Sequence, residues 1–501
     1  MRAPDASEFV DAVQTHADAV LEHARDERTP LLTDALDASA RRPIAYDGRD
    51  VAEGRLSNAA LQQSFLRALV GLDELGAGDY RSAAEEVVSW TFENLRDETG
   101  LLYWGGHAAY DLDEREVVVN KHSHELKFEY PFYEFLHEVD PAATERFVEA
   151  FWNAHVIDWE TLDFNRHGDW GASMGELWTN EYTGGDVFFW GNGLTFVNTG
   201  SDLYYAAGLL ADFTGEEAPL AWAKRLARRY VETRQETGIS GYQFSQHASY
   251  CNGPAIRGDR AQYQFAPYIH GDHKIYEGTL FRPRPIVQRQ QLALAERLGE
   301  RGEPFERWAI EELRAWREAA YRPSENEFEP MLTDGRSLEG FVIRREGYFG
   351  PKGRVIGPIE AGPEFLWTYA RAYRASGDDL CRQMVRDIAA GLGLGDIGAP
   401  GDAPSLDADV GREAVEPGTL HGLLELYRAE GNEAYLDAAA RVGGALIDAR
   451  EHGLFTDDEG RAVLDDPTPL ALLRLAGALD GESPEALPTP VGNRHTPTGG
   501  I

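Results

Sequence analysis

The chain has 501 residues, of which 43% are hydrophobic and 11% aromatic, so it can bury a large core. It carries 85 acidic against 48 basic side chains, a formal net charge of −37, which argues against nucleic-acid binding and is typical of the solvated acidic surface of halophilic proteins. Apolar runs long enough for a membrane helix or a signal peptide do not occur, so we predict a cytoplasmic protein with no membrane partner.

Six segments along the chain share one outline: an apolar helix, a turn that contains Gly or Asp, and a second amphipathic helix. In chain order they are residues 65–95, 132–156, 204–234, 291–316, 367–392 and 422–446. Within each, apolar residues recur at i, i+3, i+4 and i+7, which is the period of a helix with one buried side. One such hairpin cannot bury its apolar stripe alone, so the hairpins must pack on one another.

We therefore predict an all-α protein whose hairpins close into an (α/α) toroid, with a few short β-strands in the connections. Segments 8–26 and 469–479 would add a seventh pair, so an (α/α)7 ring is favoured over an (α/α)6 ring. An open solenoid is disfavoured because connections such as 157–201 and 238–283 are long. A single catalytic domain is expected over residues 1–482, followed by a flexible Pro- and Gly-rich tail at 483–501.

Metal-competent side chains lie outside the hairpin pattern. His107 follows two glycines in "LLYWGGHAAYDL", His124 and Glu125 lead into a predicted helix in "HELKFEYPFYEF", and His167 lies in a turn beside Arg166. Two imidazoles and one carboxylate suit Mn²⁺, Fe²⁺, Ni²⁺ or Zn²⁺ better than an all-oxygen cage would. The spacing alone is not specific, since a lone histidine is more often a hydrogen-bonded core or surface residue.

Four long stretches, in this order, carry a family resemblance: "LYWGGHAAYDLD", "HELKFEYPFYEFLHEVDP", "FVEAFWNAHVIDWETLDFNRHGDWG" and "TFVNTGSDLYYAAGLL". Together they resemble the family 2 polysaccharide lyases, which are pectate lyases with an (α/α)7 toroid fold. The resemblance covers residues 55–270 and extends more loosely to residue 450.

In that family two histidines and one glutamate hold a divalent metal, commonly manganese, and the arginine before the second histidine is the base. The resemblance implies His107, Glu125 and His167 as metal ligands and Arg166 as the catalytic base. It implies Mn²⁺ as the cofactor, with Ca²⁺, Ni²⁺ or Zn²⁺ as alternatives. Glu129, one turn further along the predicted helix, is the alternative carboxylate ligand.

The implied reaction is β-elimination in an acidic oligosaccharide such as oligogalacturonate or pectate. A cation on the uronate carboxylate stabilises the charge that forms as the C5 proton leaves, and the C4–O bond then breaks. Arginine normally stays protonated in proteins, but the metal, Lys127 and desolvation would favour its neutral form. If Arg166 stays protonated, the substitute bases are Tyr130, Lys121 and Lys127.

Aromatic faces for pyranose stacking and cations for uronate carboxylates occur in the connections, although core tryptophans and surface ion pairs are the commoner roles of such residues. The predicted substrate contacts are Tyr103, Trp104, Lys127, Tyr130, Trp170 and Arg260. Further candidates are Trp178, Trp190, Arg257, Lys274, Arg282 and Arg284.

Three other functions stay open. A glycoside hydrolase of the unsaturated uronyl type would need two carboxylates facing the scissile bond. These would come from Asp163, Asp169, Glu176 and Asp186. A sugar epimerase would use histidine bases such as His247 and His273, and a helical scaffold would need no catalytic residue. Hydrolysis and epimerisation should survive chelation, whereas the lyase should not.

Overall fold

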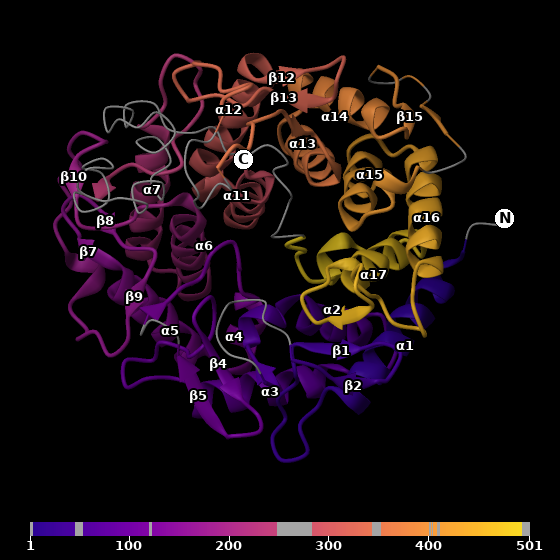
Figure 1. Cartoon of the computed structure of the whole chain (residues 1–501), viewed down its shortest axis with the longest axis horizontal. Helices are drawn as coiled ribbons and strands as arrows, with labels where there is room; N and C mark the ends of the chain where they lie inside the picture. Colours follow the sequence, from indigo (N-terminus) through magenta and orange to yellow (C-terminus); the bar gives the residue numbers. More distant parts are fainter. Residues whose placement is uncertain are drawn as a thin grey trace.

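The computed structural model describes residues 4–45, 54–119, 123–247, 283–342, 352–399, 402, 404–407 and 411–492. Within these ranges, seven inner and seven outer α-helices form two concentric rings (Figure 1). The inner helices are α2 (Gln63–Glu74), α4 (Tyr133–Val139), α6 (Val197–Thr214), α11 (Pro285–Leu298), α13 (Pro363–Ser376), α15 (Pro417–Glu430) and α17 (Thr468–Leu479). The outer helices are α3 (Arg81–Asn94), α5 (Pro141–His155), α7 (Glu217–Val231), α12 (Glu303–Ala319), α14 (Asp379–Gly391), α16 (Glu433–Asp448) and α1 (Ala6–His23).

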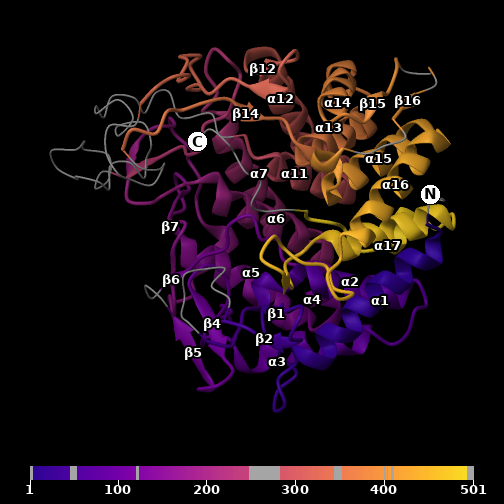
Figure 2. The same ribbon diagram turned by 45° about the vertical axis from the view of Figure 1, so that its right-hand side comes forward.

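The two ends of the chain close the ring. Helix α17 packs on α1 and also on its inner neighbours α2 and α15, and Figures 1 and 2 both place α17 beside α1 and α2. Phe9 and Val13 of α1 are fully buried, and Arg450, which follows α16, donates to the Ala12 carbonyl over 3.2 Å. The predicted (α/α)7 toroid with its seventh pair is therefore confirmed.

The turns inside the helix pairs are short and follow local rules. Asp140 caps α5 by accepting from the Ala143 amide over 2.9 Å, and Pro141 occupies the first helical turn. Gly215 and Gly377 end α6 and α13 in the left-handed conformation. Because the six pairs that are consecutive in the chain turn round within a few residues, the long connections join an outer helix to the next inner helix.

Short strands stabilise these long connections, as predicted. Two three-stranded sheets have the orders β17–β1–β2 and β3–β4–β5, and a third has the order β12–β13–β14. Their strands are β1 (Ala35–Asp37), β2 (Arg42–Pro43), β17 (Arg461–Val463), β3 (Leu56–Ser57), β4 (Ala108–Asp111), β5 (Glu116–Val119), β12 (Tyr321–Arg322), β13 (Glu327–Phe328) and β14 (Ile359–Glu360). The two-stranded pairs are β6 (Ser123–His124) with β9 (Gly168–Asp169), β7 (Val156–Asp158) with β8 (Asp163–Phe164), β10 (Trp190–Gly191) with β11 (Gln246–His247), and β15 (Gly395–Asp396) with β16 (Ser405–Leu406).

The tail that was expected to be flexible from residue 483 is packed as far as Gly492. Arg289 of α11 donates to the Val491 carbonyl over 2.7 Å, and Gln290 donates to the Pro490 carbonyl over 3.1 Å. Arg474 of α17 donates to three further carbonyls of this segment. Proline and glycine content did not reveal these arginine contacts from the inner helices, and residues 493–501 lie outside the described part of the chain.

Candidate active site

Three predicted ligands converge where two neighbouring long connections meet. His107 and Glu125 belong to the connection between α3 and α4, and His167 belongs to the one between α5 and α6. His107 Nε2 lies 3.3 Å from Glu125 Oε2, and His167 Nε2 lies 3.6 Å from Glu125 Oε1. The two Nε2 atoms are 3.4 Å apart. One donor atom from each residue thus faces a common point.

The Glu125 carboxylate has a cation beside each oxygen. Arg166 Nε lies 3.4 Å from Oε1, and Lys127 Nζ lies 3.4 Å from Oε2. Burial raises the pKa of Glu125, but the charges of Arg166 and Lys127 outweigh burial and hold the pKa at about 2. The buried carboxyl group is therefore ionised at neutral pH.

The imidazole of His167 is neutral at the same pH. Burial lowers its pKa, and the charge of Arg166 lowers it further, to about 3. A neutral imidazole keeps a lone pair available for a metal. The ionised carboxylate and the neutral ring are in the protonation states that a divalent cation needs.

The donor set also fits a cation in its spacing. Neither oxygen of Glu125 has a hydrogen-bond partner among the described residues, although both are buried. Metal–ligand bonds of about 2.1 Å place neighbouring donors roughly 3.0–3.4 Å apart at octahedral or tetrahedral angles. The observed separations of 3.3, 3.4 and 3.6 Å are close to that range. The three residues can hold a divalent cation with little movement.

Two glycines let His107 approach the carboxylate. Gly105 has φ +92° and pairs with Glu125 in a parallel bridge, and a Cβ at Gly105 would lie 2.1 Å from the Glu125 carbonyl oxygen. A Cβ at Gly106 would lie 2.4 Å from Glu125 Oε2. Asn58 fixes this turn by donating to the Gly105 carbonyl and accepting from its amide, over 2.8 and 3.0 Å. The glycine pair of "YWGGH" is thus a steric requirement of the site.

Arg166 and His167 are held by a buried histidine pair that we did not predict. His155 Nδ1 lies 2.8 Å from the Asn165 carbonyl oxygen, and His155 Nε2 lies 2.9 Å from His124 Nδ1. A Cβ at Gly168 would lie 2.6 Å from the His155 ring, which explains the glycine after His167. Burial lowers the pKa of His155 to about 4, so it supports the turn as a neutral ring.

The predicted helix at His124 and Glu125 was wrong, because His124 ends strand β6 and α4 begins only at Tyr133. Phe128 and Tyr130 have φ values of +61° and +43°, which a helix does not allow. Their amides both donate to the Asp202 carboxylate, over 2.6 Å each, so a side chain of α6 sets this irregular, non-helical path. Glu129 therefore does not share a helix face with Glu125, and it lies outside the ligand cluster.

A sequence model of a family described as "Periplasmic pectate lyase" matches residues 29–500. The chain belongs to this pectate lyase family. It is 32% identical over 505 residues to the pectate disaccharide-lyase of Dickeya dadantii (strain 3937), with 94% of this chain and 89% of that protein covered. The recognition of a polysaccharide lyase from the sequence is confirmed.

Two solved structures resemble this pectate lyase distantly. The α-1,2-mannosidase from Trichoderma reesei has a TM-score of 0.48 and 11% identity, covering 95% of this chain and 94% of that one. The cellobiose 2-epimerase from Bacillus thermoamylovorans B4167 has a TM-score of 0.45 and 12% identity, covering 94% and 98%. These values do not bear on the chemistry of the lyase.

The cytoplasmic location predicted from the sequence is contradicted by the family, which is described as periplasmic. That prediction relied on the missing apolar signal segment, and such an absence does not determine a compartment. In the described part of this pectate lyase, no helix is both long and apolar enough to cross a membrane.

The predicted substrate contacts divide into accessible and buried groups. Tyr103 and Trp170 are half-buried and face each other with ring centroids 4.8 Å apart, and Lys127 is also partly exposed. Trp104 is only 1% exposed and Tyr130 is fully buried, so neither ring offers a face to a sugar. Burial raises the pKa of Tyr130 well above its usual value, which also makes it unsuitable as a base.

The structure describes only some of the remaining predicted substrate contacts. Arg260, Arg257, Lys274, Arg282 and the substitute base Lys121 lie outside the described residues. Trp178 is partly buried and packs in an aromatic group with the buried Trp152 and the partly buried Trp159.

The carboxylates that the hydrolase alternative would use differ in their surroundings. Asp163 is 3% exposed and accepts hydrogen bonds from the Asn192 and Gly193 amides and the Ser245 hydroxyl, so it holds the connection together. The other three, Asp169, Glu176 and Asp186, are exposed. For the epimerase alternative, the His247 side chain and His273 lie outside the described residues.

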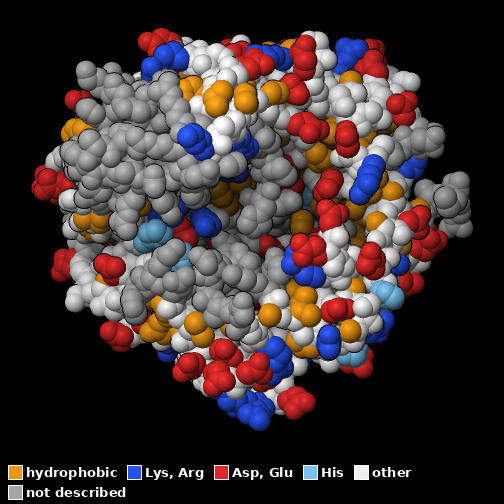
Figure 3. All heavy atoms as spheres, in the orientation of Figure 1, with side chains coloured by type: hydrophobic (Ala, Val, Ile, Leu, Met, Phe, Trp, Pro, Cys, Tyr) orange, Lys and Arg blue, Asp and Glu red, His pale blue; other side chains and the backbone are white. Residues whose placement is uncertain are grey.

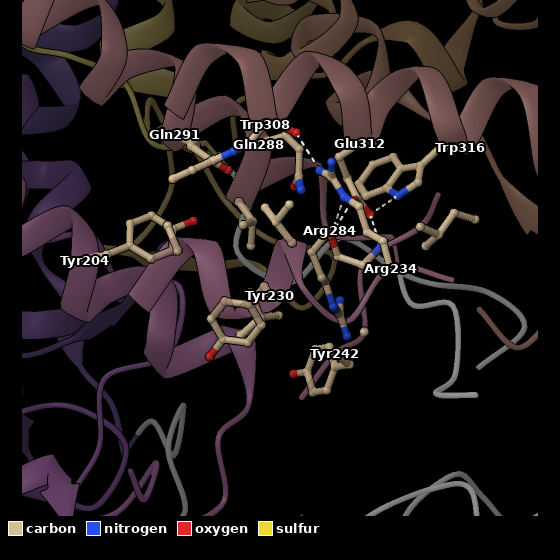
Figure 4. Close-up of a pocket in the computed structure, with 17 residues that line it drawn as sticks. Tyr204, Tyr230, Arg234, Tyr242, Arg284, Gln288, Gln291, Trp308, Glu312 and Trp316 are labelled. Atoms are coloured by element: carbon tan, nitrogen blue, oxygen red, sulfur yellow. Dashed lines mark hydrogen bonds and ion pairs between the residues drawn. The ribbon is translucent and has the colours of Figure 1, made fainter. Parts of the chain in front are cut away.

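Part of a small polar pocket between α6, α7, α11 and α12 is held together by internal hydrogen bonds (Figure 4). Glu312 accepts hydrogen bonds from the Ser240 amide and hydroxyl and from the Trp316 ring, and Arg234 lies 3.3 Å from its carboxylate. Arg284 points away from this network toward Tyr242, and its guanidinium carbon lies 5.7 Å from the centre of the Phe128 ring. Arg284 thus adds a cation over the ring of the residue that follows Lys127.

Proposed function

We propose that this pectate lyase cleaves oligogalacturonate by metal-assisted β-elimination, with His107, Glu125 and His167 as ligands and Arg166 as the base. The observation that carries the proposal is the buried, ionised Glu125 carboxylate, which two imidazole nitrogens and Arg166 approach within 3.3–3.6 Å. The D. dadantii relative is named a pectate disaccharide-lyase. We therefore expect an unsaturated disaccharide among the products.

Arg166 is held in a position suited to proton abstraction. Its side chain is only 9% exposed, its guanidinium carbon lies 5.7 Å from the centre of the Phe196 ring, and its amide donates to the Leu194 carbonyl. Desolvation of a guanidinium near Lys127 favours its neutral form. When bound, a divalent cation would stabilise the negative charge that develops on the uronate and would offset the Glu125 charge that favours protonated arginine.

Other side chains of the site would bind and orient the sugar. Lys127 lies beside Glu125 and Arg284 lies over the Phe128 ring, and both cations suit the carboxylates of neighbouring uronate units. Tyr103 and Trp170 offer partly exposed rings. The two-nitrogen, one-oxygen donor set suits Mn²⁺, with Ni²⁺, Zn²⁺ and Ca²⁺ as the competitors that metal analysis would rank.

The ultraviolet absorbance of the unsaturated product tests the function. Oligogalacturonate incubated with the protein and Mn²⁺ should gain absorbance, and EDTA should abolish the gain. Release of reducing sugar with no gain in absorbance would instead establish a hydrolase. Activity that survives EDTA would remove the metal from the mechanism.

Activity is expected to rise with ionic strength. Acidic side chains are spread over the visible face of the ring, and the net charge of −37 repels a polyanionic substrate at low salt (Figure 3). The Debye length falls from about 30 Å at 0.01 M salt to about 3 Å at 1 M, so salt removes the repulsion. The KM for oligogalacturonate, measured over this range, should fall while kcat changes little. A KM that is lowest in dilute buffer would contradict the acidic-surface argument.

A further inference from the structure

A second pocket, of about 520 Å³, lies on the outer wall of the ring. It is formed by the neighbouring outer helices α7 and α12 and by residues 182–185 of the connection between α5 and α6. Six side chains give it its chemistry: Lys224, Arg225, Arg228, Arg307, Tyr182 and Trp308. Its volume is within the range of about 300–1,000 Å³ that is usual for small-molecule sites. Four cations in one hollow are unusual in a chain with a net charge of −37.

Two of these cations have no carboxylate within 4.0 Å among the described residues. The Arg225 guanidinium carbon lies 4.5 Å from the centre of the Trp222 ring and 5.1 Å from that of Tyr182, so two aromatic rings hold it in place. Lys224 is half-buried, and its pKa is lowered, first by burial. Both charges are partly desolvated and directed into a hollow where an anion would pair with them.

The other two cations are already paired. Arg228 lies 3.0 Å from Glu232, the one carboxylate in the lining, and Arg307 lies 2.8 Å from Glu303. These exposed pairs contribute little binding energy and are screened by salt. The anion-binding capacity of the pocket therefore depends on Lys224 and Arg225.

Hydrogen bonds hold the backbone that forms the floor of the pocket. Arg229, which is fully buried, donates to the carbonyls of Gly185 and Asp186 over 2.8 and 3.2 Å. The amides of Thr183 and Gly184 both donate to the Glu160 carbonyl over 2.9 Å. The backbone of the pocket is thus held by hydrogen bonds, and two cations without a carboxylate partner and the partly exposed Trp308 line it. These features make it a preformed binding site.

We propose that this pocket is a second, non-catalytic binding site for a carboxylated oligosaccharide. Uronate carboxylates would pair with Lys224 and Arg225, and a pyranose ring would pack on Trp308 or Tyr182. The choice of a uronan over other anions rests on the pectate lyase chemistry proposed above, because both sites would then bind one polymer. The site would hold a polymer near the enzyme while another part of the chain is cleaved.

Two measurements on the full-length protein test the site. In EDTA, where turnover is blocked, we expect Lys224→Ala/Arg225→Ala to raise the Kd for polygalacturonate about tenfold in affinity electrophoresis. With Mn²⁺, the same variant should raise the KM for polygalacturonate by a similar factor and leave kcat/KM for trigalacturonate within about twofold. The matched control, Arg146→Ala/Arg386→Ala, removes two charges from outer helices α5 and α14 and should change neither quantity.

Each outcome decides the proposal. Equal polymer binding by the parent and the pocket variant, or equal losses in the pocket variant and the control, would overturn it. A variant that loses inorganic phosphate or nucleic-acid binding but not polygalacturonate binding would also overturn it. Polymer binding that depends on Lys224 and Arg225 in a protein without elimination activity would support the pocket and reject the proposed reaction.

Discussion

Replacing Arg166 with alanine is expected to lower kcat on oligogalacturonate about 10²–10⁴-fold, the usual contribution of a general base. Its guanidine is buried beside the ligand cluster, with Nε 3.4 Å from Glu125 Oε1. The alanine variant should still bind Mn²⁺, because none of the three ligands is changed. Absorbance of the unsaturated product gives kcat, and electron paramagnetic resonance of free Mn²⁺ gives the metal affinity.

Two further variants separate proton abstraction from charge. Lys127→Ala removes the other cation beside Glu125 and should raise KM while kcat stays within about tenfold, since a positioning charge contributes mainly to binding. Arg166→Lys keeps a charge on a shorter side chain and should restore little of kcat. If Lys127→Ala abolished turnover and Arg166→Ala only raised KM, the roles of the two residues would be exchanged.

The fold was predictable because each helical hairpin has to bury an apolar stripe, and the same pattern therefore recurs along the chain. Each segment shows the helical period, and capping residues such as Asp140 and Gly377 mark its ends. The seventh pair was also predictable from its apolar pattern. The packed segment at residues 483–492 was not, because arginines of helices distant in sequence bind its carbonyls.

The candidate site, like the fold, was predictable only in part. His107, Arg166 and His167 were found through motifs that are local in sequence. The path of the chain around Glu125 was predicted wrongly, because Asp202, which lies 74 residues beyond Phe128, holds that backbone in a non-helical form. The contact between His124 and His155 was not predictable, because no sequence pattern links the two residues. Contacts between distant segments set the conformation in both cases, and one sequence does not display them.

Replacing Glu125 with glutamine is expected to abolish both metal binding and turnover. The amide has nearly the same shape but no charge, and its NH₂ group cannot donate an electron pair to a cation. Affinity for Mn²⁺ should fall by at least about 100-fold, the upper end of what losing even an indirect ligand contact costs. Metal at 100 times its Kd should stabilise the parent by about 2.7 kcal/mol, and this stabilisation should be absent in the variant. Thermal unfolding with and without Mn²⁺ measures the difference independently of catalysis.

Glu129→Gln is the matched control, because it makes the same change four residues away in the same buried segment. It should keep the rise in melting temperature with Mn²⁺, since Glu129 lies outside the cluster of His107, Glu125 and His167. The reverse result, in which Glu129→Gln loses the metal response and Glu125→Gln keeps it, would reassign the carboxylate ligand. If both variants lost the rise in melting temperature with Mn²⁺, the whole segment from Glu125 to Glu129, and not one carboxylate, would determine metal affinity. A response in both would place the metal elsewhere and remove the reason for a base at Arg166.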